Sequence, residues 1–236
     1  MSAPLRAGIL AAGRGERLRT SSAPLKPLVT VAGETLIERV LRSIAEAGPS
    51  DVTIIINEDS RAVHDHVSRK EWPFALHWIV ETTPSSMHSF LRLVEELARD
   101  GTGGPYLLST VDTVAGPRTY AGFMKSALAG EAAMTLALTS PGDDEKPLLV
   151  RLAPGESRIE TFGEGDQATA GIYAVRSTIL REAEEARRDG LDALRKFLGR
   201  LLERGYHLAG IPIAGSIDVD HPGDVAAAEL FLRSAG

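Results

Sequence analysis

The residues with the clearest chemical potential lie near the start of the chain, between positions 13 and 26. A short apolar run ends at Ala11, and the segment after it holds Gly13, Gly15, three arginines and Lys26. Glycine exposes backbone N–H groups, and the cationic side chains add positive charge, which together suit a bound polyphosphate. Such a segment offers little to a hydrophobic core, so we interpret it as a phosphate-binding segment.

The spacing within this segment excludes two well-known phosphate loops. It contains no Gly-Lys-Ser or Gly-Lys-Thr, so it is not a P-loop. A dinucleotide fingerprint needs a third glycine and an acidic ribose ligand, and neither is found at the usual distance. Some other class of nucleotide-binding protein must account for the pattern.

Three aspartates are candidates for binding a divalent cation, which triphosphate chemistry normally requires. Asp112 follows the apolar segment YLLST at residues 106–110, and Asp218 and Asp220 lie in SIDVDHP at 216–222. On an extended strand, Asp218 and Asp220 would point the same way, so their spacing does not separate them. Asp220 also precedes Pro222, which is typical of a helix start, so it has a structural alternative.

The elements that position these residues alternate through the first half of the chain. Strands are expected at 5–11, 51–56, 76–80 and 106–110, and helices at 35–47, 60–68 and 86–98. This alternation predicts an α/β fold with a doubly wound, mostly parallel, Rossmann-like sheet flanked by helices. Catalytic groups in such sheets lie at the carboxyl ends of the strands, where Gly13 and Asp112 fall.

The second half has a different pattern, which favours a more antiparallel arrangement. Strands are expected at 132–139, 148–152, near 159, 170–175 and 206–213, and helices at 177–188, 191–204 and 222–233. We predict one domain over residues 1–236, with a nucleotide-binding half at 1–130. Residues 131–236 would form the acceptor-binding half and the closing helix.

Composition limits the possible partners and the compartment. The 236 residues are 43% hydrophobic and 25% charged, with a net charge of −6, which argues against nucleic acid or an anionic membrane as partner. The absence of cysteine excludes disulfides and thiolate chemistry. No signal peptide core and no apolar run of about 18 residues occur, which predicts a cytoplasmic protein.

The segment from Leu10 to Ile37, LAAGRGERLRTSSAPLKPLVTVAGETLI, resembles the signature of the sugar-1-phosphate nucleotidyltransferases. Part of it is shared with the cytidylyltransferases and the molybdenum-cofactor nucleotidyltransferases. The resemblance implies that Arg17 and Lys26 are catalytic cations, and that Mg²⁺ binds to Asp112 and Asp218, with Asp220 competing for the second place. It implies the following nucleotide-binding residues: Leu10, Ala11, Ala12, Gly13, Arg14, Gly15, Ser85 and Ser86.

The resemblance further implies that Glu164 and Gly171 bind the acceptor. Two positions depart from the family pattern: Val111 replaces the glycine that usually precedes the aspartate, and Gly165 replaces the lysine of a Glu-Lys-Pro segment. Ser85 and Ser86 also have an alternative role as N-caps of the helix that follows.

The resemblance therefore implies an enzyme that transfers a nucleoside monophosphate from an NTP to a small phosphorylated acceptor and releases pyrophosphate. A sugar-1-phosphate is the first candidate acceptor, a homo-oligomer is possible, and no fused second activity is expected. Two alternatives remain. One is a non-catalytic nucleotide-sugar sensor or regulatory subunit. The other is a nucleotide-sugar-dependent glycosyltransferase, for which the Asp-Val-Asp at 218–220 would be the metal motif.

Overall fold

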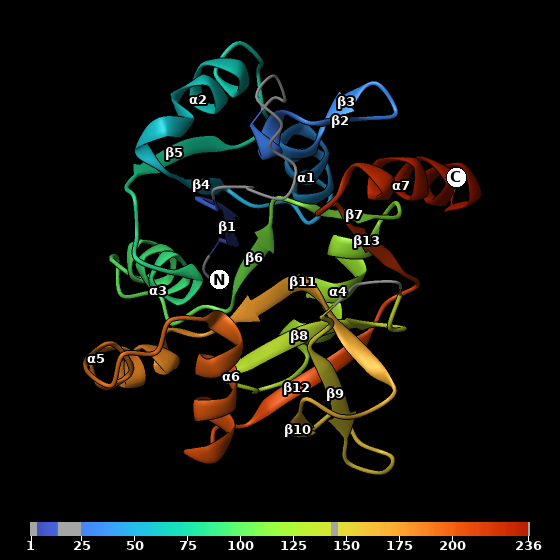
Figure 1. Ribbon diagram of the computed structural model, residues 1–236. Helices are drawn as coiled ribbons and strands as arrows, with labels where there is room; N and C mark the ends of the chain where they lie inside the picture. Colours follow the sequence, from blue (N-terminus) through green and yellow to red (C-terminus); the bar gives the residue numbers. More distant parts are fainter. Residues whose placement is uncertain (1–3, 14–24, 143–145, 236) are drawn as a thin grey trace.

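Four of the predicted strands form a parallel sheet in the computed structural model, which describes residues 4–13, 25–142 and 146–235. The strands are β1 (Arg6–Ala11), β4 (Asp51–Ile56), β5 (Ala75–Val80) and β6 (Tyr106–Thr110). Their order in the sheet is β6-β1-β4-β5, and every pairing among them is parallel. Because the strands run the same way, their carboxyl ends meet at one edge, where Figure 1 shows β1 and β6 ending near each other.

The second half extends this sheet with mainly antiparallel pairings. The strands are β8 (Met134–Thr139), β9 (Leu149–Leu152), β10 (Ile159–Phe162), β11 (Gln167–Val175) and β12 (Leu208–Pro212). The long strand β11 pairs antiparallel with β6, β8 and β9, and thereby joins the two halves into one nine-stranded sheet. Strands β8 and β12 are parallel to each other. The predicted fold class, with a more antiparallel second half, is confirmed.

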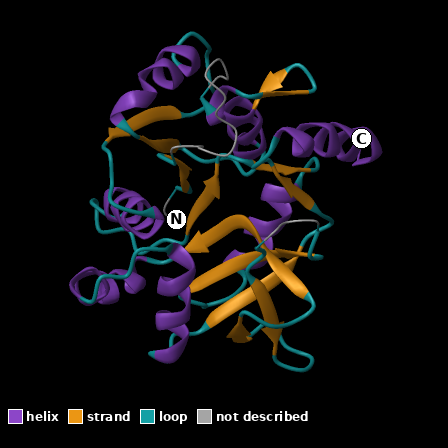
Figure 2. Ribbon diagram, in the orientation of Figure 1, coloured by secondary structure: helices purple, strands orange, loops and turns teal. Residues whose placement is uncertain are grey.

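Helices cover both faces of the sheet, as a doubly wound fold requires (Figure 2). One core cluster contains side chains of α1 (Leu36–Ala45), α2 (Arg61–Val67) and α4 (Thr119–Leu128). The other contains side chains of α3 (Ser86–Leu97), α5 (Ala183–Arg188) and α6 (Leu194–Glu203). Alternate side chains of β1 enter opposite clusters: Ile9 packs with the first and Leu10 against the second.

Several short elements lie near the carboxyl edge. A hairpin forms from β2 (Thr30–Val31) and β3 (Glu34–Thr35), and β7 (Thr113–Ala115) pairs antiparallel with β13 (Ser216–Asp218). The closing helix α7 (Pro222–Ala235) contacts β13 and β2, and Figure 1 shows it beside them. The pairing of β7 with β13 matters most for the site, because it places the late aspartates next to the end of β6. Three short 3-10 helices, at Lys26–Leu28, Glu58–Ser60 and Ser177–Glu182, complete the described secondary structure.

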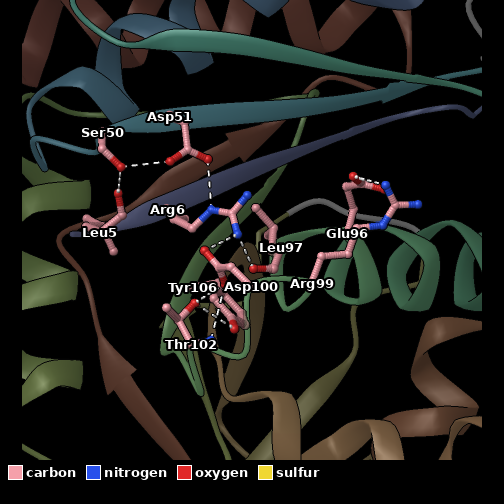
Figure 3. A network of polar contacts seen from close by, with 10 residues as sticks. All are labelled: Leu5, Arg6, Ser50, Asp51, Glu96, Leu97, Arg99, Asp100, Thr102 and Tyr106. Atoms are coloured by element: carbon pink, nitrogen blue, oxygen red, sulfur yellow. Dashed lines mark hydrogen bonds and ion pairs between the residues drawn. The ribbon is translucent and has the colours of Figure 1, made fainter. Parts of the chain in front are cut away.

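Arg6 makes a set of polar contacts at the amino end of the parallel strands, opposite the edge that carries the cation and the aspartates (Figure 3). Its guanidinium donates to Asp51 Oδ1 at 2.9 Å, to the Leu97 carbonyl at 2.5 Å and to Asp100 Oδ2 at 3.1 Å. These contacts tie the starts of β1 and β4 to the end of α3. The edge that carries the candidate site is therefore built on a sheet whose other end is held by ionic contacts.

Glu38 links the start of α1 to α2. Its carboxylate accepts from Thr35 N at 3.3 Å, which is half of a capping box, and also contacts His66 Nε2 at 2.8 Å and Lys70 Nζ at 2.6 Å. Burial opposes ionisation of Glu38, but the hydrogen bonds from Lys70, Thr35 and His66 outweigh it and lower the pKa to about 2. The carboxylate is therefore charged at neutral pH and supports the start of α1.

None of the helices in the described ranges is both long and apolar enough to cross a lipid bilayer.

Candidate active site

A cavity of about 550 Å³ opens at the carboxyl ends of β1 and β6. Eight residues predicted for the site line it: Leu10, Ala12, Gly13, Lys26, Ser85, Ser86, Asp112 and Asp220. Ala11, between two of them, packs into the core on the side of α1. Arg14, Gly15 and Arg17 lie outside the described residues, so their predicted roles stay predictions.

Lys26 bridges two carboxylates at the rim of this cavity. Its Nζ lies 2.5 Å from Asp112 Oδ2 and 2.5 Å from Asp220 Oδ1, and 11% of the lysine side chain is exposed. Burial alone would lower the pKa of the Lys26 ammonium, but the charges and hydrogen bonds of Asp112 and Asp220 outweigh it and raise the pKa. Lys26 is therefore a fixed positive charge that faces the cavity.

The 3-10 helix at Lys26–Leu28 positions the lysine. Leu28 N donates to the Leu25 carbonyl at 2.7 Å, and Val29 N donates to the Lys26 carbonyl at 3.1 Å. Pro27 is buried and Leu28 packs against the core beside α1. This turn is held by the same helix whose start Glu38 stabilises.

Asp218 lies beside the Lys26 cluster but does not line the cavity. It is the last residue of β13, and its Oδ1 accepts a hydrogen bond from Thr113 Oγ1 at 3.1 Å. Burial first, and then the negative charges of Asp112 and Asp220, raise the pKa of Asp218 to about 7. The carboxyl groups of Asp112, Asp218 and Asp220 thus lie near a single ammonium, that of Lys26. Acidic groups therefore outnumber basic ones at this part of the site.

Another aspartate accepts hydrogen bonds from the backbone at Asp220. At the start of α7, Asp224 Oδ2 accepts from Asp220 N at 2.8 Å and from His221 N at 2.6 Å. Asp224 thus accepts backbone N–H groups at this helix start, while the Asp220 carboxylate contacts Lys26.

The segment from Thr83 to Ser89 forms the wall opposite these carboxylates. Ser85 is the N-cap residue of α3 but makes no side-chain capping bond, and its Oγ contacts His88 Nδ1 at 2.8 Å. Ser86 Oγ accepts from Leu194 N at 3.1 Å, which links the start of α3 to the start of α6. Simple N-capping of α3 by Ser85 is thus not what the structure contains.

The two residues predicted to bind the acceptor lie apart from the cavity lining. Glu164 is 59% exposed and pairs with Arg151 at 3.1 Å. Gly171 lies in β11 where the pairing register shifts, and its φ of +69° is in the region that favours glycine. Five further residues line the cavity that no motif in the sequence indicates: Thr83, Pro84, Ser89, Thr110 and Leu194.

The donor set suits a hard divalent cation if a ligand supplies further oxygens. In the part of the chain that the structure describes, no three acidic or histidine side chains are placed to hold an ion together. Asp112 and Asp218 each use one carboxylate oxygen in the side-chain bonds described above. Mg²⁺ accepts one or two carboxylates together with water and substrate phosphates, so this pair fits.

The fold and this site define a nucleotidyltransferase, and comparison with known proteins places the chain within that class. Residues 7–200 match the family described as the MobA-like NTP transferase domain, and the chain belongs to that family. This confirms the predicted family and enzyme class.

Two curated relatives are similar over 96% of this chain. The first is CMP-5'-(3-aminopropyl)phosphonate synthase of Streptomyces rubellomurinus, 29% identical over 38% of its own length. The second is the bifunctional IPC transferase and DIPP synthase of Rubrobacter xylanophilus, 27% identical over 51% of its length. A mannose-1-phosphate guanyltransferase of Yarrowia lipolytica is 26% identical over 73% of this chain and 49% of its own. This chain therefore spans only about two fifths to half of these relatives.

Solved structures confirm the fold over nearly the whole chain. The inositol-1-phosphate CTP transferase from T. maritima superposes with a TM-score of 0.77 at 19% identity, covering 97% of this chain and 95% of that one. A putative glucose-1-phosphate thymidylyltransferase from Bacillus anthracis gives 0.80 at 18% identity, with 98% and 96% covered.

Proposed function

We propose that this chain transfers a nucleoside monophosphate from an NTP to a small phosphorylated acceptor and releases pyrophosphate. The observation that carries the proposal is the Lys26 ammonium, held between Asp112 and Asp220 at the mouth of a cavity at the carboxyl end of a parallel sheet. The names of the relatives support it, since they pair a nucleotide with a phosphorylated or phosphonate compound. A sugar-1-phosphate or polyol phosphate is the proposed acceptor class.

In this reaction an oxygen of the acceptor phosphate attacks the α-phosphorus of the NTP. The bond from the α-phosphorus to the oxygen that bridges to the β-phosphorus breaks, and pyrophosphate leaves with that electron pair. No side chain forms a covalent bond, so the rate depends on positioning and on neutralising phosphate charge. Lys26 supplies such a charge from this chain, and Arg17 is proposed as the second.

Asp112 and Asp218 are the proposed ligands of Mg²⁺, which would supply positive charge at the reacting phosphates. The closeness of Asp112, Asp218 and Asp220 supports the assignment, because burial and then the charges of Asp112 and Asp220 raise the pKa of Asp218, and a bound cation would favour its ionised form. Asp220 keeps its place as the partner of Lys26. The alternative in which Asp220 is the second ligand is separated from this one by the variants in the Discussion.

The remaining assignments are proposals that rest on the sequence. The nucleotide would bind over Leu10, Ala12 and Gly13, with Ser85 and Ser86 near the base. The acceptor would lie toward the half at 131–236, where Glu164 and Gly171 are its predicted ligands. A single domain over 1–236 and a cytoplasmic location are proposed on the same grounds.

A screen of pyrophosphate release tests the proposal. Purified protein is incubated with Mg²⁺, each of the four common NTPs, and a panel of sugar-1-phosphates and polyol phosphates. The proposal expects release that needs one NTP and one acceptor together and stops with EDTA. Inactivity across the panel, combined with tight binding of a finished nucleotide sugar, would overturn it in favour of the sensor.

A further inference from the structure

Thr113 occupies a junction between four elements, directly behind the cavity. It is 2% exposed, and its Oγ1 lies within hydrogen-bond distance of three oxygens. These are Thr110 Oγ1 at 2.8 Å, Asp218 Oδ1 at 3.1 Å and the Ala170 carbonyl at 3.3 Å. The hydroxyl therefore touches the end of β6, the end of β13 and the middle of β11.

The Thr113 hydroxyl carries one proton, so it can be the donor in only one of these three contacts. A threonine hydroxyl can donate only one hydrogen bond, although it can accept two. An ionised carboxylate only accepts, and bonds to charged acceptors are stronger than bonds to a neutral carbonyl. When Asp218 is ionised, as a cation ligand must be, Thr113 donates to it and accepts from Thr110, which lines the cavity.

Gly171 makes this arrangement possible. A Cβ placed on Gly171 would lie 2.3 Å from Thr113 Oγ1 and 2.5 Å from Thr110 Oγ1, closer than any real contact. Gly171 also has a φ of +69°, a backbone conformation that residues with a side chain rarely adopt. The shift in register of β11 at this point thus leaves room for two hydroxyl groups to meet.

We propose that Thr113 is a positioning residue, which holds the Asp218 carboxylate in the orientation that binds the divalent cation, and that Gly171 leaves space for its hydroxyl. The inference rests on the proposed function, in which Asp218 is a cation ligand. It gives Gly171 a role inside the protein in addition to its predicted place at the acceptor. The antiparallel pairing of Thr113 with Asp218 sets the two residues opposite each other across the β7–β13 ladder.

Three variants separate the effect of the Thr113 hydroxyl from the effect of the side chain's shape. Thr113→Val keeps the shape and removes the donor, and Thr113→Ser keeps the donor. Thr53→Val is the matched control, because Thr53 is 1% exposed and its hydroxyl has no partner among the described residues. Mn²⁺ binding is measured by electron paramagnetic resonance with NTP present and acceptor absent, beside kcat and the Mg²⁺ concentration for half-maximal rate.

We expect Thr113→Val to weaken Mn²⁺ binding by about tenfold, the size of one lost hydrogen bond to a charged group. The Mg²⁺ requirement should rise in parallel, while Thr113→Ser and Thr53→Val stay within about threefold of the native protein. In the Asp218→Asn background, Thr113→Val should have no further effect on Mn²⁺ binding, since the hydroxyl acts through that carboxylate. If Thr113→Val does not fold, Thr113→Cys replaces it, because a thiol is a weak donor.

Native Mn²⁺ binding in Thr113→Val or Thr113→Cys would overturn the inference, as would equal losses in the serine variant. An effect that persists unchanged in the Asp218→Asn background would also overturn it. Because Mn²⁺ binding needs no turnover, the result stands apart from the proposed function. If the native protein binds Mn²⁺ and NTP but yields no product with any acceptor, the proposed function fails while the role of Thr113 is still decided.

Discussion

The ammonium of Lys26 lies 2.5 Å from the carboxylate of Asp112, although 86 residues separate the two in the chain. One residue belongs to the segment that follows β1 and the other to the turn that ends β6. The parallel pairing of these strands brings them to the same edge of the sheet. A cation and a carboxylate predicted separately from the sequence thus belong to one site.

Lys26→Ala should lower kcat by roughly 10²–10³-fold, because one preorganised charge at the reacting phosphate is lost. The KM for the NTP should change much less. Steady-state kinetics at saturating acceptor measure both values, with Lys125→Ala, on α4, as the control. A Lys26→Ala variant with near-native turnover would show that the lysine only neutralises the two aspartates.

Asp218→Asn and Asp220→Asn separate the two candidate ligands. We expect Asp218→Asn to abolish turnover and to weaken Mg²⁺ activation, because the amide removes a ligand charge. Asp220→Asn should lower kcat through Lys26 and leave the Mg²⁺ requirement nearly unchanged. Titration of the rate with Mg²⁺ measures this, and a changed Mg²⁺ requirement in Asp220→Asn alone would move the assignment to Asp220.

Asp224→Ala should lower stability, since Asp224 accepts two backbone N–H groups at the start of α7. Loss of a cap of this kind costs about 0.5–2 kcal/mol of unfolding free energy. Urea denaturation measures the change, and Asp224→Asn, which keeps an acceptor, should recover most of it. An unchanged midpoint in Asp224→Ala would show that solvent replaces the cap at no cost.

Glu38 should make stability depend on pH in acid. Its pKa is about 2 in the folded protein, below the ordinary 4.5, so its contribution is complete above pH 4.5. That contribution is lost as the pH falls from about 4.5 toward 2. The difference in Tm between the native protein and Glu38→Gln should therefore be largest near pH 7 and shrink below pH 4.5. A difference that stays constant between pH 7 and pH 3 would contradict the ionic contacts of Glu38.

The sequence predicts the long elements well, because their apolar periods are clear. Strand β4 has the predicted bounds, and α3 ends one residue earlier than expected. The predicted helix at 177–188 is instead a 3-10 helix followed by α5. Helix α4 was missed, although Tyr120, Phe123, Met124 and Ala127 have helical spacing and are buried.

The parts that could not be predicted depend on contacts between distant residues. Strands β7 and β13 have three residues each, too few for a recognisable period, and they are defined only by pairing with each other. The hydrogen bond from Thr113 to Asp218 spans 105 residues, so the sequence around either residue does not predict it. Lys26 and Asp112 could be found because they lie in or next to recognisable motifs, whereas Thr113 acts through tertiary contacts.

The central claim, that an acceptor phosphate takes up the nucleotidyl group, is tested most directly by isotope transfer. An acceptor from the pyrophosphate screen is labelled with ¹⁸O in its phosphate, and the products are analysed by mass spectrometry. We predict that every labelled oxygen stays in the nucleotide-linked product and that the pyrophosphate is unlabelled. Pyrophosphate formed without acceptor, or nucleoside monophosphate in place of a linked product, would contradict it.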